Sequence, residues 1–307
     1  MQIDHTEHIA GIHNLELLAR QVVEGFITGM HKSPFHGFSV EFAEHRLYNK
    51  GESTRDIDWK LFAKTDKLFV KRYEEETNLR CQLIIDNSTS MAYPENENKK
   101  TSDLNKIGFS VVAAAAMLEI LKRQRDAYGL AVYSEKLDYF TPSKGSERHR
   151  RMLLAQLEQL LVQDKPKKTD TFAVLHQIAE KIHRRSLIFL FTDMLQADRQ
   201  EEELFAALRH LKYNKHEVVL FHTFSEKYEY NFDFGEAHKR FVDMETGERI
   251  DLFTENYREQ YQKLVQEFFN HLKMKCMQYK IDYVPVDIHQ GFDKVLSTYL
   301  IKRQQIL

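Results

Sequence analysis

LRCQLIIDNSTSM, residues 79–91, joins a mainly apolar segment to a run of polar residues. Leu83, Ile84 and Ile85 are consecutive apolar residues, which is typical of a strand buried on both faces of a parallel sheet. Asp86 follows them directly and begins a polar turn. We therefore predict an inner strand of an α/β sheet, whose polar end lies at the edge where such sheets bind ligands.

The chain beyond this segment alternates between similar apolar runs and segments with helical periodicity. The apolar runs predict further strands at 127–134, 186–193, 217–224 and 281–287. Apolar residues that recur every three or four positions predict helices at 105–124, 147–162, 171–184, 199–213, 256–279 and 292–303. This alternation predicts a doubly wound, mostly parallel α/β sheet of the Rossmann type with right-handed crossovers.

Two parts of the chain depart from this alternation. Residues 1–78 are predicted to form an N-terminal extension, and residues 79–307 the main domain. The extension is predicted to hold one helix and two strands, at 14–29, 36–42 and 67–76. Two short strand patterns around Gly247 predict a β-hairpin inserted into the main domain near 239–252.

Composition excludes several classes of protein. The 307 residues include 44 Lys and Arg against 46 Asp and Glu, so the chain lacks the basic excess typical of proteins that bind nucleic acid or anionic membranes. No apolar run is long enough to span a bilayer. The two cysteines, Cys81 and Cys276, are too few for a disulfide framework, which fits a reducing compartment. We expect a cytoplasmic protein with no nucleic-acid partner and no membrane insertion.

Polar oxygens are expected to gather where the predicted strands end. Asp86, Ser88 and Ser90 follow the first strand, Asp193 ends the strand at 186–193, and Thr169 precedes the helix at 171–184. Two carboxylates and three hydroxyls suit a small, hard dication such as Mg²⁺ or Mn²⁺. In this interpretation the Ser88 and Ser90 hydroxyls bind the metal directly. The two aspartates then hold its coordinated waters.

Other interpretations of the same residues stay open. Asp86, Ser88 and Ser90 are also the residue types that form a turn and cap the following helix. A Mg²⁺-dependent hydrolase or phosphatase is a second alternative. However, Ser88 stands where phosphatases similar to haloacid dehalogenases carry a second aspartate, and the GxSxG, P-loop and GxGxxG motifs do not occur. We therefore expect no enzymatic activity.

The Asp86-x-Ser88-x-Ser90 pattern resembles the metal-ion-dependent adhesion site of von Willebrand factor A domains. Thr169 and Asp193 stand where that family places its threonine and its second aspartate. The resemblance implies that the two serines and the threonine ligate the metal and that the aspartates act mostly through water. It also implies that an acidic residue of a bound partner completes the coordination.

A second resemblance covers nearly the whole chain and rests on separated motifs in the expected order. These are Phe38–Arg46, Tyr48, Gly51, Arg55, Asp58–Lys60, Lys71–Glu76, Thr169–Asp170, Arg185–Ser186 and Asp243–Gly247. They resemble a bacterial family catalogued as domain of unknown function 58, although Glu52 stands where that family usually has Asp. The resemblance implies an adaptor or chaperone-like role beside an AAA+ ATPase of the MoxR type, which would be the partner together with its client protein. A metal-free structural interaction protein is the remaining alternative.

Two groups of charged residues lie outside this candidate site. Arg46, Arg55, Asp58 and Trp59 form a cluster that suits either a partner-docking surface or an internal ion pair with a buried Trp. Residues 148–151, Arg-His-Arg-Arg, give a basic start to the helix at 147–162, where the helix dipole disfavours cations. Contact with acidic partners is one interpretation of these residues, and an exposed turn is the one that we expect.

Overall fold

The computed structural model describes residues 15–31, 45–47, 59–65, 67–71, 79–94, 104–161, 171–194, 201–235, 238–243 and 247–306. The helices in these ranges are α1 (Leu15–His31), α2 (Trp59–Thr65), α3 (Lys106–Arg123), α4 (Glu147–Leu160), α5 (Thr171–Lys181), α6 (Glu201–Tyr213), α7 (Thr254–Gln278) and α8 (Asp293–Ile306). Two short helical turns are η3 (Thr89–Ala92) and η5 (Glu226–Tyr230). The strands are β1 (His45–Leu47), β2 (Phe69–Lys71), β3 (Arg80–Asp86), β4 (Ala127–Tyr133), β5 (Leu137–Phe140), β6 (Leu187–Thr192), β7 (Glu217–Phe224), β8 (His238–Val242), β9 (Arg249–Phe253) and β10 (Asp282–Asp287).

The main sheet, within the described residues, has six strands in the order β10-β7-β6-β3-β4-β5. All neighbours are parallel except β4 and β5, which pair as an antiparallel edge. In β3, Ile85 pairs with Phe191 of β6, and Asp86 pairs with Tyr133 of β4. The prediction of a doubly wound, mostly parallel α/β sheet is confirmed, whereas the edge strand β5 was not predicted.

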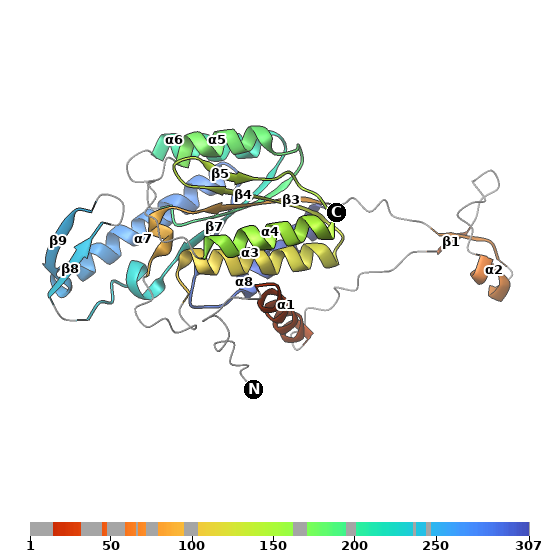
Figure 1. The fold of residues 1–307 in the computed structure, drawn as a ribbon, viewed down its shortest axis with the longest axis horizontal. Helices are drawn as coiled ribbons and strands as arrows, with labels where there is room; N and C mark the ends of the chain where they lie inside the picture. Colours follow the sequence, from red (N-terminus) through yellow and green to blue (C-terminus); the bar gives the residue numbers. More distant parts are fainter. Residues whose placement is uncertain are drawn as a thin grey trace.

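Helices cover both faces of this sheet (Figure 1). Leu83 and Ile85 belong to the hydrophobic core shared with α3, α4 and α8, whereas Ile84 points into the core shared with α5, α6 and the C-terminal end of α7. All three side chains are fully buried. The apolar run in β3 therefore arises because both of its faces are covered, as predicted.

Helix α1 packs on the outer side of the layer formed by α3 and α4 (Figure 1). Leu15, Ala19 and Val23 form its buried stripe, and the run of small side chains at 113–116 of α3 is buried in the same core. Part of the predicted N-terminal extension thus packs directly on the main domain. The predicted boundary at residue 78 stays a prediction.

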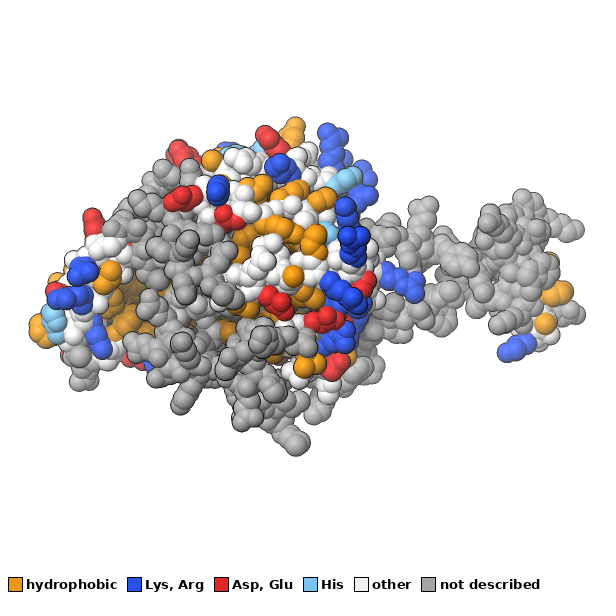
Figure 2. Space-filling view, viewed as in Figure 1, with side chains coloured by type: hydrophobic (Ala, Val, Ile, Leu, Met, Phe, Trp, Pro, Cys, Tyr) orange, Lys and Arg blue, Asp and Glu red, His pale blue; other side chains and the backbone are white. Residues whose placement is uncertain are grey.

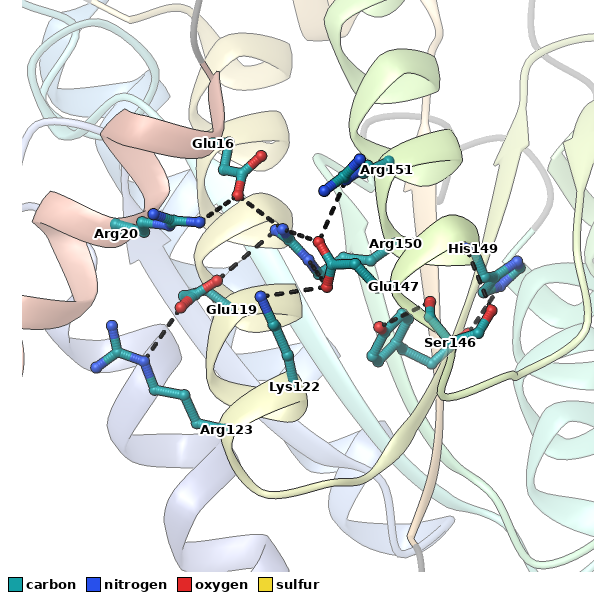
Figure 3. A network of polar contacts seen from close by, with 11 residues as sticks. Glu16, Arg20, Glu119, Lys122, Arg123, Ser146, Glu147, His149, Arg150 and Arg151 are labelled. Atoms are coloured by element: carbon teal, nitrogen blue, oxygen red, sulfur yellow. Dashed lines mark hydrogen bonds and ion pairs between the residues drawn. The ribbon is translucent and has the colours of Figure 1, made fainter.

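Arg150 corrects the expectation that residues 148–151 form an exposed basic turn. Its side chain is buried, and its guanidinium binds Glu147 of the same helix at 2.6 Å and Glu16 of α1 at 2.7 Å (Figure 3). Glu119 of α3 contributes a further counter-charge 3.7 Å from Nη1. The three carboxylates from three helices compensate the charge that burial would otherwise make costly. Arg151, by contrast, is exposed as predicted.

The predicted hairpin is present as the antiparallel pair β8 and β9, at the N-terminal end of α7 (Figure 1). Val242, Ile250 and Phe253 are each at least half exposed, and Figure 2 shows apolar and basic side chains together at this end of the molecule. Strands β1 and β2 form a separate antiparallel pair.

The predicted cluster of Arg46, Arg55, Asp58 and Trp59 lies outside the described residues as far as its side chains are concerned. Among the residues that the structure does describe, no helix is long and apolar enough to cross a membrane.

Candidate metal centre

The carboxylate of Asp86 stands at the C-terminal end of the central strand β3 and is almost fully buried. Its Oδ1 accepts a hydrogen bond from the backbone N–H of Ser88 at 2.9 Å, which closes an Asx turn. Its Oδ2 accepts a hydrogen bond from the Thr192 hydroxyl of the adjacent strand β6 at 2.8 Å. These two bonds fix the carboxylate in one orientation at the end of the sheet.

The hydroxyls of Ser88 and Ser90 face each other after that turn. Their Oγ atoms lie 3.0 Å apart, and Ser88 precedes η3 without capping it through its side chain. Two oxygens in adjacent positions of an octahedral Mg²⁺ shell, each about 2.1 Å from the metal, also lie about 3 Å apart. The separation of these hydroxyls therefore fits adjacent metal ligands.

Asp193 lies at the end of β6, next to Asp86, because the two parallel strands end at the same edge of the sheet. It is 4% exposed. Burial and the neighbouring charge of Asp193 raise the pKa of Asp86 to about 6. Two buried carboxylates that repel each other form a site that a cation stabilises.

A lysine enters this site from a third element. Lys106, the first residue of α3, has no exposed surface, and its ammonium donates to Asp193 Oδ2 at 2.7 Å and to Glu229 Oε1 at 2.6 Å. Burial disfavours the charged lysine, but the charges of Asp193 and Glu229 outweigh burial and raise the pKa of Lys106. Glu229 comes from η5, the short turn that follows β7.

The charges at this end of the sheet do not cancel among these groups. Asp86, Asp193 and Glu229 contribute three carboxyl groups, and Lys106 contributes one ammonium. When all three carboxyl groups are ionised, this end of the sheet carries a net negative charge, which attracts a cation. The donor set, with its hydroxyl and carboxylate oxygens, is of the kind that Mg²⁺ and Mn²⁺ prefer.

The structure thus brings four of the five predicted site residues to one end of the sheet: Asp86, Ser88, Ser90 and Asp193. Thr169 lies outside the described residues. The described part of the chain holds no group of three or more His, Cys, Asp or Glu side chains arranged around a metal position. That result leaves the predicted ligand set untested, since its direct ligands are hydroxyls. The assignment of these residues to a metal stays a prediction.

Three residues that surround the site were not predicted from the sequence: Thr192 and Lys106, which contact its aspartates, and Glu229, which contacts Lys106. Lys106 carried the clearest signal, because it follows Asn105, whose side chain caps α3 by accepting from Gly108 N–H. A cation in the first turn of a helix is disfavoured by the helix dipole, so a buried one needs nearby carboxylates to stabilise it.

A family model described as "Protein of unknown function DUF58" matches residues 44–268. The chain belongs to the DUF58 family. Curated relatives include uncharacterized proteins of Mycobacterium tuberculosis and Mycobacterium bovis, each 23% identical over 193 residues. Those matches cover 63% of this DUF58 chain and 59% of each relative, so the chain spans about three fifths of their length.

Solved structures with similarity to this DUF58 protein cover about three quarters of its chain. BatB from Bacteroides thetaiotaomicron is 13% identical, with a TM-score of 0.42 over 74% of this chain and 99% of BatB. An aerotolerance-related membrane protein from Bacteroides fragilis is 13% identical, with a TM-score of 0.40 over 74% of this chain and 98% of that one. The PilB minor pilin from Streptococcus sanguinis is 13% identical, with a TM-score of 0.40 over 78% and 64% of the two chains. The fold assignment rests on the strand order and register described above.

Proposed function

We propose that this protein is a metal-dependent protein-interaction module rather than an enzyme. In this proposal Asp86, Ser88, Ser90, Thr169 and Asp193 hold Mg²⁺ or Mn²⁺, and an acidic side chain of a partner supplies a further ligand. The observation that carries the proposal is the meeting of two buried carboxylates with two hydroxyl oxygens 3.0 Å apart at one end of the sheet.

Each residue has a distinct part in this function. The Ser88 and Ser90 hydroxyls are neutral, so they would bind the cation without cancelling its charge. Asp86, whose orientation is fixed by Ser88 N–H and the Thr192 hydroxyl, would accept from metal-bound water. When bound, the metal supplies a positive charge that attracts a carboxylate. A site with few direct carboxylate ligands keeps most of that charge available for a partner.

The partner is proposed from the DUF58 resemblance, which points to an AAA+ ATPase of the MoxR type or its client protein. An adaptor that binds an acidic side chain of its partner needs a site that this side chain can reach. Ser90, at the C-terminal edge of the sheet, is partly exposed and so meets this requirement. A cytoplasmic location belongs to the same proposal.

Binding of Mn²⁺ alone tests the first half of the proposal. Calorimetry on chelator-stripped protein should give one site, and Ser88→Ala together with Ser90→Ala should weaken it at least tenfold. Ser297→Ala is the matched control, because Ser297 is a partly exposed α8 residue whose hydroxyl bonds within its own helix. Equal affinity in the double variant and the wild type contradicts the proposed ligand set.

Capture of the purified MoxR-type ATPase from the same organism tests the second half. We expect capture in Mg²⁺, loss of capture in chelator, and loss in Asp86→Asn with the fold retained by circular dichroism. Capture that is the same in chelator and in Mg²⁺ supports the metal-free alternative. Turnover of a generic phosphate ester in Mg²⁺, abolished by Asp86→Asn, supports the enzyme alternative.

A further inference from the structure

The Lys106 ammonium is shared between an acid inside the candidate metal centre and an acid outside it. Its distances to Asp193 Oδ2 and Glu229 Oε1 are 2.7 and 2.6 Å, so neither contact dominates. Asp193 is one of the two buried strand-end aspartates, whereas the Glu229 side chain is 18% exposed and comes from η5. Lys106 thus has a partner on each side.

The position of Lys106 is fixed by the loop that carries the two serines. Its backbone N–H donates to the Tyr93 carbonyl at 3.1 Å, and Tyr93 N–H donates to the Ser90 carbonyl at 3.1 Å. Asn105 adds a second tie, from its side-chain amide to the Ala92 carbonyl at 3.1 Å. These bonds fix the backbone of Lys106 relative to the loop that carries the two serines, and the side chain reaches its two carboxylates from there.

Glu229 is held as firmly on the opposite side. Its Oε2 accepts from Ser225 N–H at 2.7 Å, and its backbone carbonyl accepts from the Tyr261 hydroxyl of α7 at 3.1 Å. Burial raises the pKa of Glu229, and the charge of Lys106 opposes this rise. Neither anchor involves Asp193, so Glu229 keeps its place whether or not Asp193 contacts the lysine.

We propose that Lys106 sets the divalent-cation affinity of the centre and that Glu229 controls how strongly it does so. This inference rests on the proposed function. The ammonium neutralises part of the charge on Asp193 and repels a second cation nearby, so it weakens metal binding. Glu229 offers the ammonium a second carboxylate at a similar distance and so draws it away from Asp193. Glu229 therefore strengthens metal binding. Lys106 and Glu229 are positioning residues, and neither is assigned as a metal ligand.

Opposite effects of two neutralising substitutions test this inference. Lys106→Gln should lower the dissociation constant for Mn²⁺ at least tenfold, because the repelling charge is gone. Glu229→Gln should raise it at least threefold, because Lys106 is left with Asp193 as its carboxylate partner. Both variants lose a buried ion pair, so both should unfold at lower temperature than the wild type in chelator.

A purely structural role predicts a different pattern, in which both variants lower stability and change Mn²⁺ affinity in the same direction or leave it unchanged. Either result overturns the inference. Should Lys106→Gln fail to fold, Glu229→Gln decides alone, because its amide retains a hydrogen-bond acceptor for Lys106. If the wild type binds Mn²⁺ and Glu229→Gln binds it equally well, only this inference fails. If the wild type and both variants bind no Mn²⁺ at millimolar concentration, the proposed metal centre fails as well.

Discussion

The Thr192 hydroxyl donates a hydrogen bond to Asp86 Oδ2 at 2.8 Å and so joins the ends of two neighbouring strands, β6 and β3. Both residues are buried, so water does not replace this bond when it is lost. The bond lowers the pKa of Asp86, against the larger effects of burial and Asp193. Thr192 therefore supports the candidate metal centre without being one of its predicted ligands.

Thr192→Val removes that donor while keeping the shape of the side chain. We expect a loss of about 1.5–3 kcal/mol in the free energy of unfolding, measured by urea denaturation in chelator, because a hydrogen bond to a buried carboxylate disappears and Met194 N–H loses the Thr192 hydroxyl as its acceptor. Thr223→Val is the matched control, since the buried Thr223 hydroxyl contacts Met91 Sδ at 3.7 Å, a weak interaction. A loss as large in Thr223→Val contradicts this account.

Arg150→Met tests the network that ties α1 to α3 and α4 (Figure 3). The variant removes the contact of Arg150 with the buried Glu119, which keeps Arg123 at 3.2 Å, so we expect a loss of about 1–3 kcal/mol in stability. The amides of α1 should also exchange hydrogen faster, because the tie from Glu16 is gone. Arg151→Met removes a neighbouring, largely exposed arginine and should change neither quantity measurably. If the amide hydrogens of α1 exchange at the same rate in Arg150→Met as in the wild type, the contact between Arg150 and Glu16 does not hold α1 in place.

Gly129→Ala tests close packing inside β4. A Cβ at Gly129 would lie 2.6 Å from the Thr141 carbonyl oxygen and 3.0 Å from Ser143 N, both backbone atoms. We expect a loss of about 1–3 kcal/mol in the free energy of unfolding, since the strand has to shift. At Gly145 the nearest atom would be 3.9 Å away, so Gly145→Ala should be tolerated. Equal stability of the two variants is the outcome that contradicts the clash.

His216 gives stability a pH dependence that can be isolated. Burial lowers the pKa of His216, whose Nδ1 accepts from Ser186 N–H at 3.1 Å. In the unfolded chain the pKa of histidine is about 6.5, so below that pH the unfolded chain binds more protons than the folded protein. The free energy of unfolding therefore falls as the pH drops. His216→Asn keeps an acceptor for Ser186 and should show a shallower fall between about pH 7 and 5. The exposed His238→Gln should keep the wild-type slope; identical slopes in all three proteins contradict the assignment.

The elements with strong local patterns were predicted well. Strand β7 was expected at 217–224 and occupies those residues, and α3 was expected at 105–124 and runs from Lys106 to Arg123. Strand β5 was not predicted because its four residues are mostly half-exposed and lack a clear alternation. Its strand conformation comes from pairing with β4, which a local pattern does not contain.

The candidate site divides in the same way. Asp86 and Asp193 follow apolar runs, so their place at the sheet edge was predictable from the chain itself. The partners of Lys106 were not predictable, because Asp193 and Glu229 are 87 and 123 residues away from it. Arg150 was expected in solvent for the same reason, since Glu16 lies 134 residues before it. Pairing between distant charges is decided by packing, and a single sequence does not display it.

The position of β3 in the middle of the sheet has a consequence for biosynthesis. Its neighbour β6 is separated from it by a long stretch of chain, with Asp86 and Thr192 standing 106 residues apart. A ribosome therefore releases β3 long before β6 has been synthesised. Until then, the backbone donors and acceptors along one edge of β3 have no partner strand. Contacts of such wide separation slow folding, so the nascent chain passes through a stage in which an apolar strand is open to pairing with other chains.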